Sequence, residues 1–245
     1  MDWNTLFFVV LPYVALLTAI IVTVYRAIYR PFSISSQSSQ LLERRRLYWG
    51  SISFHWGIVI ILLGHLVALL VPRSIVLWNA HPLRLYLLEL TGIGLGLWAL
   101  GGLVILLWRR ATVDRVRVVS TPMDFVVLVL LLVSVVTGLI TATYYRWGSY
   151  WFTGIFTPYL WGILTFRPDA APLAPLPFTI KLHVFNFYLL TLAFAFSRLV
   201  HIITWPLSYL VRPWQVVIAN RRPAGLNDED AARTGSRRVS RGISR

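Results

Sequence analysis

Two histidines, His55 and His65, occur inside the apolar run SFHWGIVIILLGHLVALLVP at residues 53–72. Two more, His183 and His201, occur in the last apolar stretch of the chain. An ionisable side chain at membrane depth is costly, and it usually has a partner or a functional role. A single imidazole could serve only to form a hydrogen bond between helices. Four of them in two stretches favour a shared chemical function.

The spacing of the four imidazoles restricts which of them could share a ligand. On continuous helices, His55 and His65 would be about 15 Å apart and His183 and His201 about 27 Å apart, so no two on one helix can bind the same metal ion. His183 and His201 would face the same way, and His65 would lie about 80° round its helix from His55. Because the two stretches run in opposite directions, we predict the pairs His55–His201 and His65–His183 at different depths. The unequal separations require tilted helices or tilted ligand planes.

Two imidazoles from facing helices, with no carboxylate or thiolate beside them, suit a haem. Structural zinc takes four protein ligands, and di-iron bundles need Glu-x-x-His spacing, which is absent from this sequence. Haem iron needs two axial ligands, and two histidines give an electron-transfer haem with no position free for oxygen. We therefore predict two non-covalent b haems with His55, His65, His183 and His201 as iron ligands. Arg198 is a candidate partner for a haem propionate, or it could extend to the lipid headgroups.

The composition identifies the elements that must position these histidines. The chain has 245 residues, of which 57% are hydrophobic and 13% charged, with a mean hydropathy of +0.69, which indicates an integral membrane protein. It has no cysteine, which excludes disulfides, CxxCH haem attachment, thiolate zinc sites and protein-ligated iron–sulfur clusters. Five stretches are near the roughly 20 residues of a spanning helix. They are about Thr5 to Tyr25, Tyr48 to Val71, Leu85 to Trp108, Phe125 to Tyr145 and Phe178 to Ile203.

These stretches predict an all-α bundle of five transmembrane helices over residues 1–204. A cytoplasmic segment and a flexible basic tail are expected over residues 205–245. No basic residue precedes the first stretch and no cleavage site follows it, so we expect a retained helix rather than a signal peptide.

The net charge of +14 is distributed unevenly between the two sides of the predicted bundle. Seventeen lysines and arginines follow the first, third and fifth stretches, and five follow the second and fourth. The positive-inside rule therefore places the N-terminus outside and the C-terminus in the cytoplasm of a multi-pass cell-membrane protein. Contact with anionic lipid accounts for the charge better than nucleic-acid binding, because no base-stacking groove is visible. His81, in the outer loop NAHPLR, is expected to be solvated.

The connection at residues 146–177 is rich in tryptophan, tyrosine, phenylalanine and proline. It is too interrupted to cross the membrane, but it is suited to lie in the outer headgroup layer and could cap a site there. On the inner side, the arginine-rich loops and Trp205 to Asn220 are expected to bind a soluble partner protein.

Several motifs resemble the gamma subunit of respiratory nitrate reductase, the membrane cytochrome b of that complex. They are SSQLLERR before FHWGIVIILLGHLVALLVP, then RVRVVSTPMDF, and above all FSRLVHIITWPLSYLVRPWQVV. The similarity extends over roughly residues 5 to 220, and all four histidines fall within or beside these motifs.

This resemblance implies a five-helix subunit that oxidises menaquinol or ubiquinol near an outer haem and releases the protons outside. Electrons would pass through an inner haem to an iron–sulfur beta subunit, and a molybdenum-containing alpha subunit would then reduce nitrate. By motif, His65 and His183 would hold the outer, distal haem, and His55 and His201 the inner, proximal one.

The chain departs from the family at the predicted quinol site, which we place between the second and third spans under the aromatic connection. The family uses a lysine in the loop after the second helix, and Arg84 is the nearest cation here. The candidate quinol-binding residues are Gly64, His65, Arg84 and Lys181. Gly64 would let a flat ring approach the backbone, or it could serve close helix packing. No residue is an obvious general base for quinol.

Two alternatives fit the same sequence. The first is a related haem b membrane subunit that serves a heterodisulfide or dissimilatory sulfite reductase. The second is a non-redox anchor or transporter, in which the histidines bond between helices or relay protons; this alternative predicts a colourless protein.

Overall fold

The computed structural model describes residues 2–30 and 42–202, all of which belong to one compact unit, Met1–Pro206. Every regular element in these residues is helical, which confirms the predicted all-α class. Five helices there are long and apolar enough to cross a membrane. They are Trp3–Tyr29 (α1 Trp3–Thr5, η1 Leu6–Val10 and α2 Leu11–Tyr29), α3 Arg45–Leu70, α5 Pro82–Thr112, α7 Pro122–Tyr144 and α10 Phe178–Phe196. The segment predicted over residues 205–245 lies outside the described residues.

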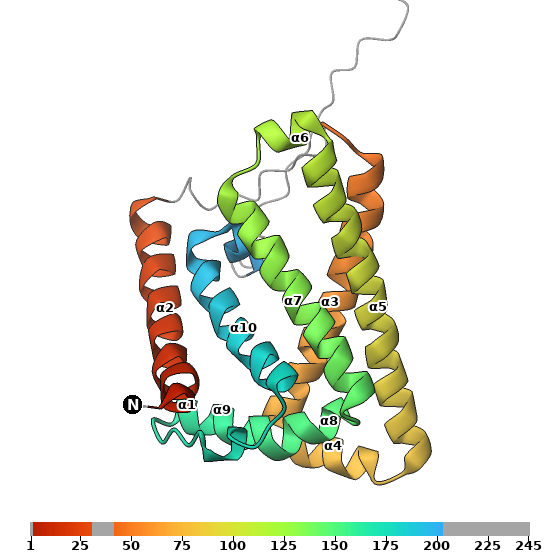
Figure 1. The fold of residues 1–245 in the computed structure, drawn as a ribbon, viewed down its shortest axis with the longest axis vertical. Helices are drawn as coiled ribbons and strands as arrows, with labels where there is room; N and C mark the ends of the chain where they lie inside the picture. Colours follow the sequence, from red (N-terminus) through yellow and green to blue (C-terminus); the bar gives the residue numbers. More distant parts are fainter. Residues whose placement is uncertain (1, 31–41, 203–245) are drawn as a thin grey trace, which may run out of the picture. The chain divides into compact units, whose positions relative to one another are not determined.

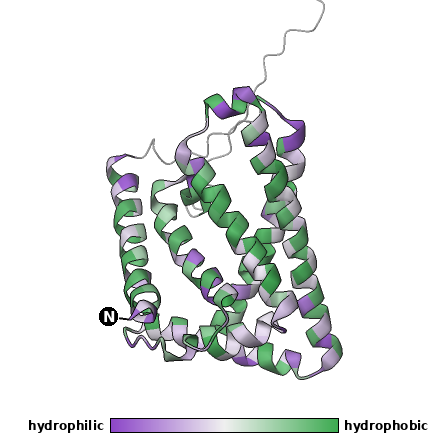
Figure 2. Cartoon of the chain, viewed as in Figure 1, coloured by the Kyte–Doolittle hydropathy of each residue, from purple (hydrophilic) through white to green (hydrophobic). Residues whose placement is uncertain are grey.

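The long helices present apolar side chains to their surroundings as well as to each other. Only between 17 and 33% of the most apolar stretch of each helix is buried within the protein. Figure 2 shows hydrophobic residues along the lengths of these helices and hydrophilic residues gathered towards their ends. Because water cannot cover so much apolar surface, lipid must surround the bundle, and the chain is a multi-pass membrane protein.

The helices pack in a sequence that differs from their order in the chain. α3 packs against α5, α5 against α7, α7 against α10, and α10 against α2 (Figure 1). α3 and α10, which carry or precede the four histidines, are not among the closely packed pairs. The histidine-bearing segments therefore face each other without a tight interface between their backbones.

α3 and α5 approach so closely that only glycine fits at the contact. A Cβ atom added to Gly57 would lie 2.8 Å from the carbonyl oxygen of Leu95, and one added to Gly102 would lie 2.5 Å from the amide nitrogen of Phe54. Small residues of this kind let membrane helices pack backbone to backbone. The contact fixes α3, and hence His55, against the rest of the bundle.

The two ends of the bundle differ in composition. One end, here called the arginine-rich end, carries the start of α3, the end of α5 and the short helix α6 Asp114–Val118. The other, here called the capped end, carries α4 Pro72–Asn79, α8 Gly148–Trp151, the π-helical turn η3 Phe152–Phe156 and α9 Thr157–Leu164. These short elements lie across the bundle rather than along it (Figure 1). The aromatic connection therefore does not cross the membrane, as predicted.

Hydrogen bonds attach this connection to the ends of the long helices. Thr157 Oγ1 donates to the Ala68 carbonyl at 3.2 Å, and Trp161 Nε1 donates to the Leu69 carbonyl at 3.1 Å. Both carbonyls belong to the last turn of α3, where a helix has no partners of its own for them. The connection thus covers the end of the helix that carries His65.

The last spanning helix is shorter than the sequence predicts. We expected it to continue to Ile203, but α10 ends at Phe196, and Ser197 is extended (φ −107°, ψ −177°) before the 3₁₀ turn η5 Arg198–Val200. Arg26 of α2 donates to the carbonyls of Ala195 (2.5 Å) and Ser197 (3.3 Å), which would otherwise be unpaired at the helix end. His201 is therefore not on the helix that carries His183, and the expected 27 Å separation along one helix is wrong.

Candidate haem-binding site

His55 and His201 face each other near the arginine-rich end. Their ring centroids are 6.4 Å apart and the ring planes are inclined by 57°. A metal–imidazole bond is about 2 Å long and the ring centre lies about 1 Å beyond the nitrogen, so two imidazoles trans to one metal have centres about 6 Å apart. The observed separation fits a metal ion between the rings.

Three of the four histidines have their Nδ1 atom bonded to a backbone carbonyl of their own segment. His55 Nδ1 lies 2.8 Å from the Ser51 carbonyl oxygen, and His65 Nδ1 lies 2.8 Å from that of Ile61. His201 Nδ1 lies 2.6 Å from the Arg198 carbonyl oxygen. A carbonyl oxygen only accepts, so Nδ1 carries the proton and Nε2 presents a lone pair.

This arrangement is typical of histidines that ligate metals, which donate their second ring nitrogen to a carbonyl, carboxylate or water. It differs from the structural use of membrane histidines, in which the imidazole bonds to another helix. His55 and His65 form no such bond within the described residues.

His183 is oriented from α7 instead. Its Nδ1 lies 2.9 Å from Thr137 Oγ1. The Thr137 hydroxyl donates to the Val133 carbonyl, so its oxygen accepts from His183 and again leaves Nε2 with the lone pair. Gly138 makes room for the ring, because a Cβ there would lie 3.1 Å from His183 Cε1. Asn186, one turn further along α10, donates to Ser134 and to the Leu130 carbonyl, and fixes the two helices together.

His65 and His183 are nearer the capped end. Phe152 of η3 packs edge-on to His65, with ring centroids 4.9 Å apart. His65, the α3 member of the second predicted pair, therefore lies directly under the connection that covers this end.

Arg198 is held in an ion pair at the arginine-rich end. Its Nε lies 3.2 Å from Asp124 Oδ1, and Asp124 Oδ2 accepts from Arg110 at 2.9 Å and from the Thr121 amide at 2.9 Å. Asp124 thus anchors the start of α7 to α5 and to η5. The carboxylate holds the Arg198 guanidinium, three residues before His201, at the arginine-rich end, where the side chain is 33% exposed.

A second ion pair fixes the start of α3. Arg109 is 2% exposed, and its guanidinium donates to Glu43 at 2.7 Å. Glu43 also accepts from the Arg46 amide at 2.8 Å. Burial alone would raise the pKa of Glu43, but the bonds from Arg46 and Arg109 outweigh it and hold the pKa below the ordinary value. Arg109, one of the arginines of the predicted docking loops, therefore forms its ion pair inside the bundle.

The four candidate quinol-binding residues have different surroundings in the structure. Gly64 and His65 are adjacent on α3, and a Cβ added to Gly64 would meet no atom within 4 Å. Arg84 lies over the Trp78 ring, 5.6 Å from its centroid, and Lys181 Nζ donates to the Ala174 carbonyl. The Arg84 and Lys181 side chains thus have partners of their own, while α3 has open space beside it at Gly64.

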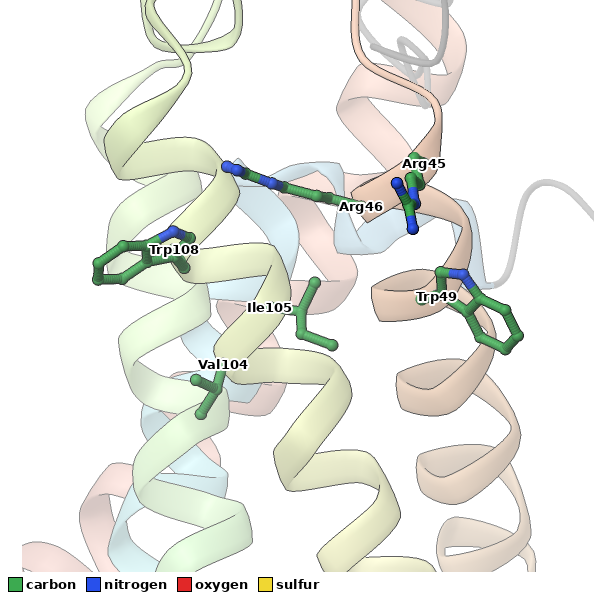
Figure 3. Close-up of a pocket in the computed structure, with 6 residues that line it drawn as sticks. All are labelled: Arg45, Arg46, Trp49, Val104, Ile105 and Trp108. Carbon is green, nitrogen blue, oxygen red and sulfur yellow. The ribbon is translucent and has the colours of Figure 1, made fainter.

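A separate groove of about 480 Å³ lies at the arginine-rich end, between α3 and α5. Figure 3 shows Ile105 between the two helices, with Trp49 and Trp108 projecting from them in different directions. The two tryptophans are 61% and 63% exposed, as expected of the aromatic belt at a membrane surface. The remaining lining residues are Arg45, Arg46 and Val104. The groove contains none of the histidines.

Sequence reasoning missed Thr137, Gly138 and Asp124, the residues that orient His183 and Arg198. A threonine followed by glycine within an apolar span was a signal for Gly138, because glycine there allows a ring to approach. Asp124 carried no such signal, since its partners are distant in the chain.

Fold and site together describe a helical membrane protein that presents two sets of imidazoles with free Nε2 atoms, a scaffold suited to metalloporphyrins. Residues 4–220 match the nitrate reductase gamma subunit family, and the chain belongs to that family. It is 35% identical over 211 residues to the nitrate reductase gamma chain of Bacillus subtilis, with 84% of this chain and 94% of that one covered. It is 32% identical over 224 residues to the respiratory nitrate reductase 2 gamma chain of Escherichia coli, covering 89% and 98%.

Proposed function

We propose that this chain is the quinol-oxidising cytochrome b subunit of a membrane-bound nitrate reductase. The observation that supports this most directly is the state of the four imidazoles, each with Nδ1 engaged and Nε2 presenting its lone pair. Family membership supplies the complex in which such a subunit works.

Two b haems would be held by this chain. His55 and His201 would ligate the one nearer the arginine-rich end, which the 6.4 Å ring separation supports. His65 and His183 would ligate the one nearer the capped end. When bound, haem supplies one-electron chemistry, and two histidines leave no iron position open for oxygen. Arg198 is the candidate propionate partner, with Asp124 positioning its guanidinium.

The two ends of the bundle would face different compartments. By the positive-inside rule, the end with the excess of arginine would lie in the cytoplasm and the capped end outside. Menaquinol or ubiquinol would bind beside Gly64 and His65, under the connection that covers the end of α3. Protons would leave at the capped end while electrons pass inward, so charge is separated without a proton channel through the bundle.

The electrons would leave at the arginine-rich end to an iron–sulfur beta subunit and then to a molybdenum-containing alpha subunit. Arg45, Arg46 and Arg115 lie on the outer part of this end and would pair with carboxylates of the soluble partner. Trp205 to Asn220, the other predicted docking segment, lies outside the described residues.

A dithionite-reduced minus oxidised spectrum of the purified chain tests the cofactor assignment. We expect the alpha band of b haem and two haems per chain. A colourless protein would reject the proposal and favour an anchor or transporter.

His201→Ala tests the pairing. The variant should lose the haem near the arginine-rich end and fail to deliver electrons to the beta subunit, while quinol still reduces the remaining haem. His81→Ala, a substitution of an exposed histidine outside both pairs, serves as the control and should retain both haems. Loss of the haem nearest the capped end in His201→Ala would overturn the pairing.

A further inference from the structure

A buried carboxylate lies at the capped end, on the second turn of α5. Glu89 is 5% exposed, and its Oε1 accepts from the amide of Ser149 at 2.9 Å and from the Ser149 hydroxyl at 2.5 Å. No described residue forms a salt bridge to it. Carboxylates are rarely retained at this depth without a function, and neither the haem ligands nor the quinol candidates include it.

Hydrogen bonds connect Glu89 with the protein surface. Asn79, 3% exposed at the end of α4, donates from Nδ2 to Ser149 Oγ at 2.8 Å. The hydroxyl of Tyr150, which is 42% exposed, donates to the Asn79 carbonyl at 3.3 Å. Asn79 Oδ1 is buried and has no hydrogen-bond partner among the described residues, so this oxygen can take a further donor such as water.

The same connection joins this network to the predicted quinol site. Ser149 lies in α8, and Phe152, the residue that packs against His65, follows it by one turn. Glu89 and Phe152 are therefore positioned by one short helical segment. On α5, a Cβ added to Gly92, one turn after Glu89, would meet no atom within 4 Å, so α5 has open space beside it at this position.

The cations and phenols on the neighbouring elements have other partners. Arg146 lies over the Trp147 ring, 5.6 Å from its centroid, and Tyr86 packs edge-on to the same ring. Arg84 lies over Trp78. The groups that bond to Glu89 are thus the neutral donors of Ser149, and Oε2 has no hydrogen bond within the described part of the chain.

We propose that Glu89 takes up the protons released when quinol is oxidised beside His65, and that the Ser149 hydroxyl passes them outward to water bound at Asn79 Oδ1. The inference rests on the proposed function. Each of the two quinol O–H bonds that break would give its proton to Glu89, and each electron would go to the haem that His65 would help to hold; loss of both protons and both electrons leaves the quinone. Glu89 passes each proton outward before it accepts the next. It acts as a proton-relay residue on the outer side of the reaction.

Three variants of the intact complex in lipid vesicles test this role. Glu89→Gln keeps an oxygen that accepts from Ser149 but cannot accept a proton, whereas Glu89→Asp keeps an ionisable group on a shorter side chain. Asp169→Asn is the control, because Asp169 is an exposed carboxylate outside the network and, among the residues that the structure describes, bonds only to the Ala171 amide.

The first measurement is the rate of haem reduction by quinol after rapid mixing. A positioned base contributes about 100-fold or more to a proton transfer, so Glu89→Gln should slow reduction by about that factor. Glu89→Asp should recover part of the rate, and Asp169→Asn should leave it unchanged. A wild-type rate in Glu89→Gln would show that Glu89 only fastens α8 to α5.

The second measurement is the redox-induced infrared difference spectrum, which does not depend on turnover. The wild type should show a carboxyl C=O band that is absent in Glu89→Gln and shifted in Glu89→Asp. If Glu89→Gln fails to assemble, the Glu89→Asp spectrum decides, and an unshifted band overturns the proposal. Failure of the proposed function is distinguishable, because quinol would then not reduce haem in the wild type either.

Discussion

Gly138 determines whether the His183 ring can occupy its position against α7. A Cβ added there would lie 3.1 Å from His183 Cε1. Carbon atoms in good contact are about 3.5–4.0 Å apart, so even alanine displaces the ring by about 0.4 Å, the difference between 3.5 and 3.1 Å. Valine adds two methyl groups beyond that Cβ. The His183 ring would then shift, and its Nδ1 would no longer reach Thr137 Oγ1.

Overpacking of this kind costs about 1–3 kcal/mol. If His183 is an axial ligand, that cost reduces the affinity for one haem by about 5- to 150-fold. Gly138→Val should therefore retain the haem of His55 and His201 and lose much of the other, and Gly138→Ala should show a smaller loss. The measurement is haem content per chain, with a redox titration to show which of the two potentials disappears.

Gly101→Val provides the matched control, because a Cβ at this glycine of α5 would meet no atom within 4 Å. It should keep both haems. If Gly138→Val binds two haems with unchanged potentials, the His183 ring is not an iron ligand in this position, and the assignment of His65 and His183 as a pair is refuted.

Three further outcomes follow from the packing and the charges. Thr137→Val removes the acceptor of His183 Nδ1–H and makes the imidazole a weaker electron donor to iron. The reduction potential of that haem should therefore rise by about 40 mV, equivalent to about 1 kcal/mol. An unchanged midpoint in a potentiometric titration would contradict this. Gly102→Val forces α3 and α5 apart at Phe54 and should lower the thermal unfolding temperature in detergent, with a cost at or above about 3 kcal/mol. Glu43 has a lowered pKa in the folded protein, so the stability that it adds to the fold is fully present above the ordinary pKa of about 4.3. This stability is lost as the pH falls through the lower pKa of the folded state. Thermal unfolding scans of Glu43→Gln at several pH values should therefore lack this part of the acid-induced loss of stability.

Hydropathy was sufficient to predict the five spans, because lipid exposure requires apolar side chains over the full length of each helix. α5 and α7 begin at Pro82 and Pro122, three residues before the predicted starts at Leu85 and Phe125, and the aromatic, proline-containing connection was correctly predicted not to cross. These features depend on local composition, and the sequence contains that information directly.

The end of α10 could not be predicted in the same way. Residues 197–203 are as apolar as a helix interior apart from Ser197, Arg198 and His201. The break in the helix depends on Arg26, which donates to the carbonyls of Ala195 and Ser197, far from it in the sequence. The expected separation of His183 and His201 failed for that reason. Similarly, the partner of Arg198 is Asp124 on another helix, and only the packing of α7 against α10 brings the two together.

The way each imidazole is held has a consequence for the order of assembly. On α3, both rings are oriented by carbonyls one turn earlier on the same helix, so their orientation exists as soon as that helix forms in the bilayer. His183 acquires its orientation only when α7 docks, and His201 only when the chain turns after Phe196. If these histidines hold haem as proposed, a nascent chain would therefore first bind it through His55 and His65 of α3 alone, and His183 and His201 would join as the later helices arrive.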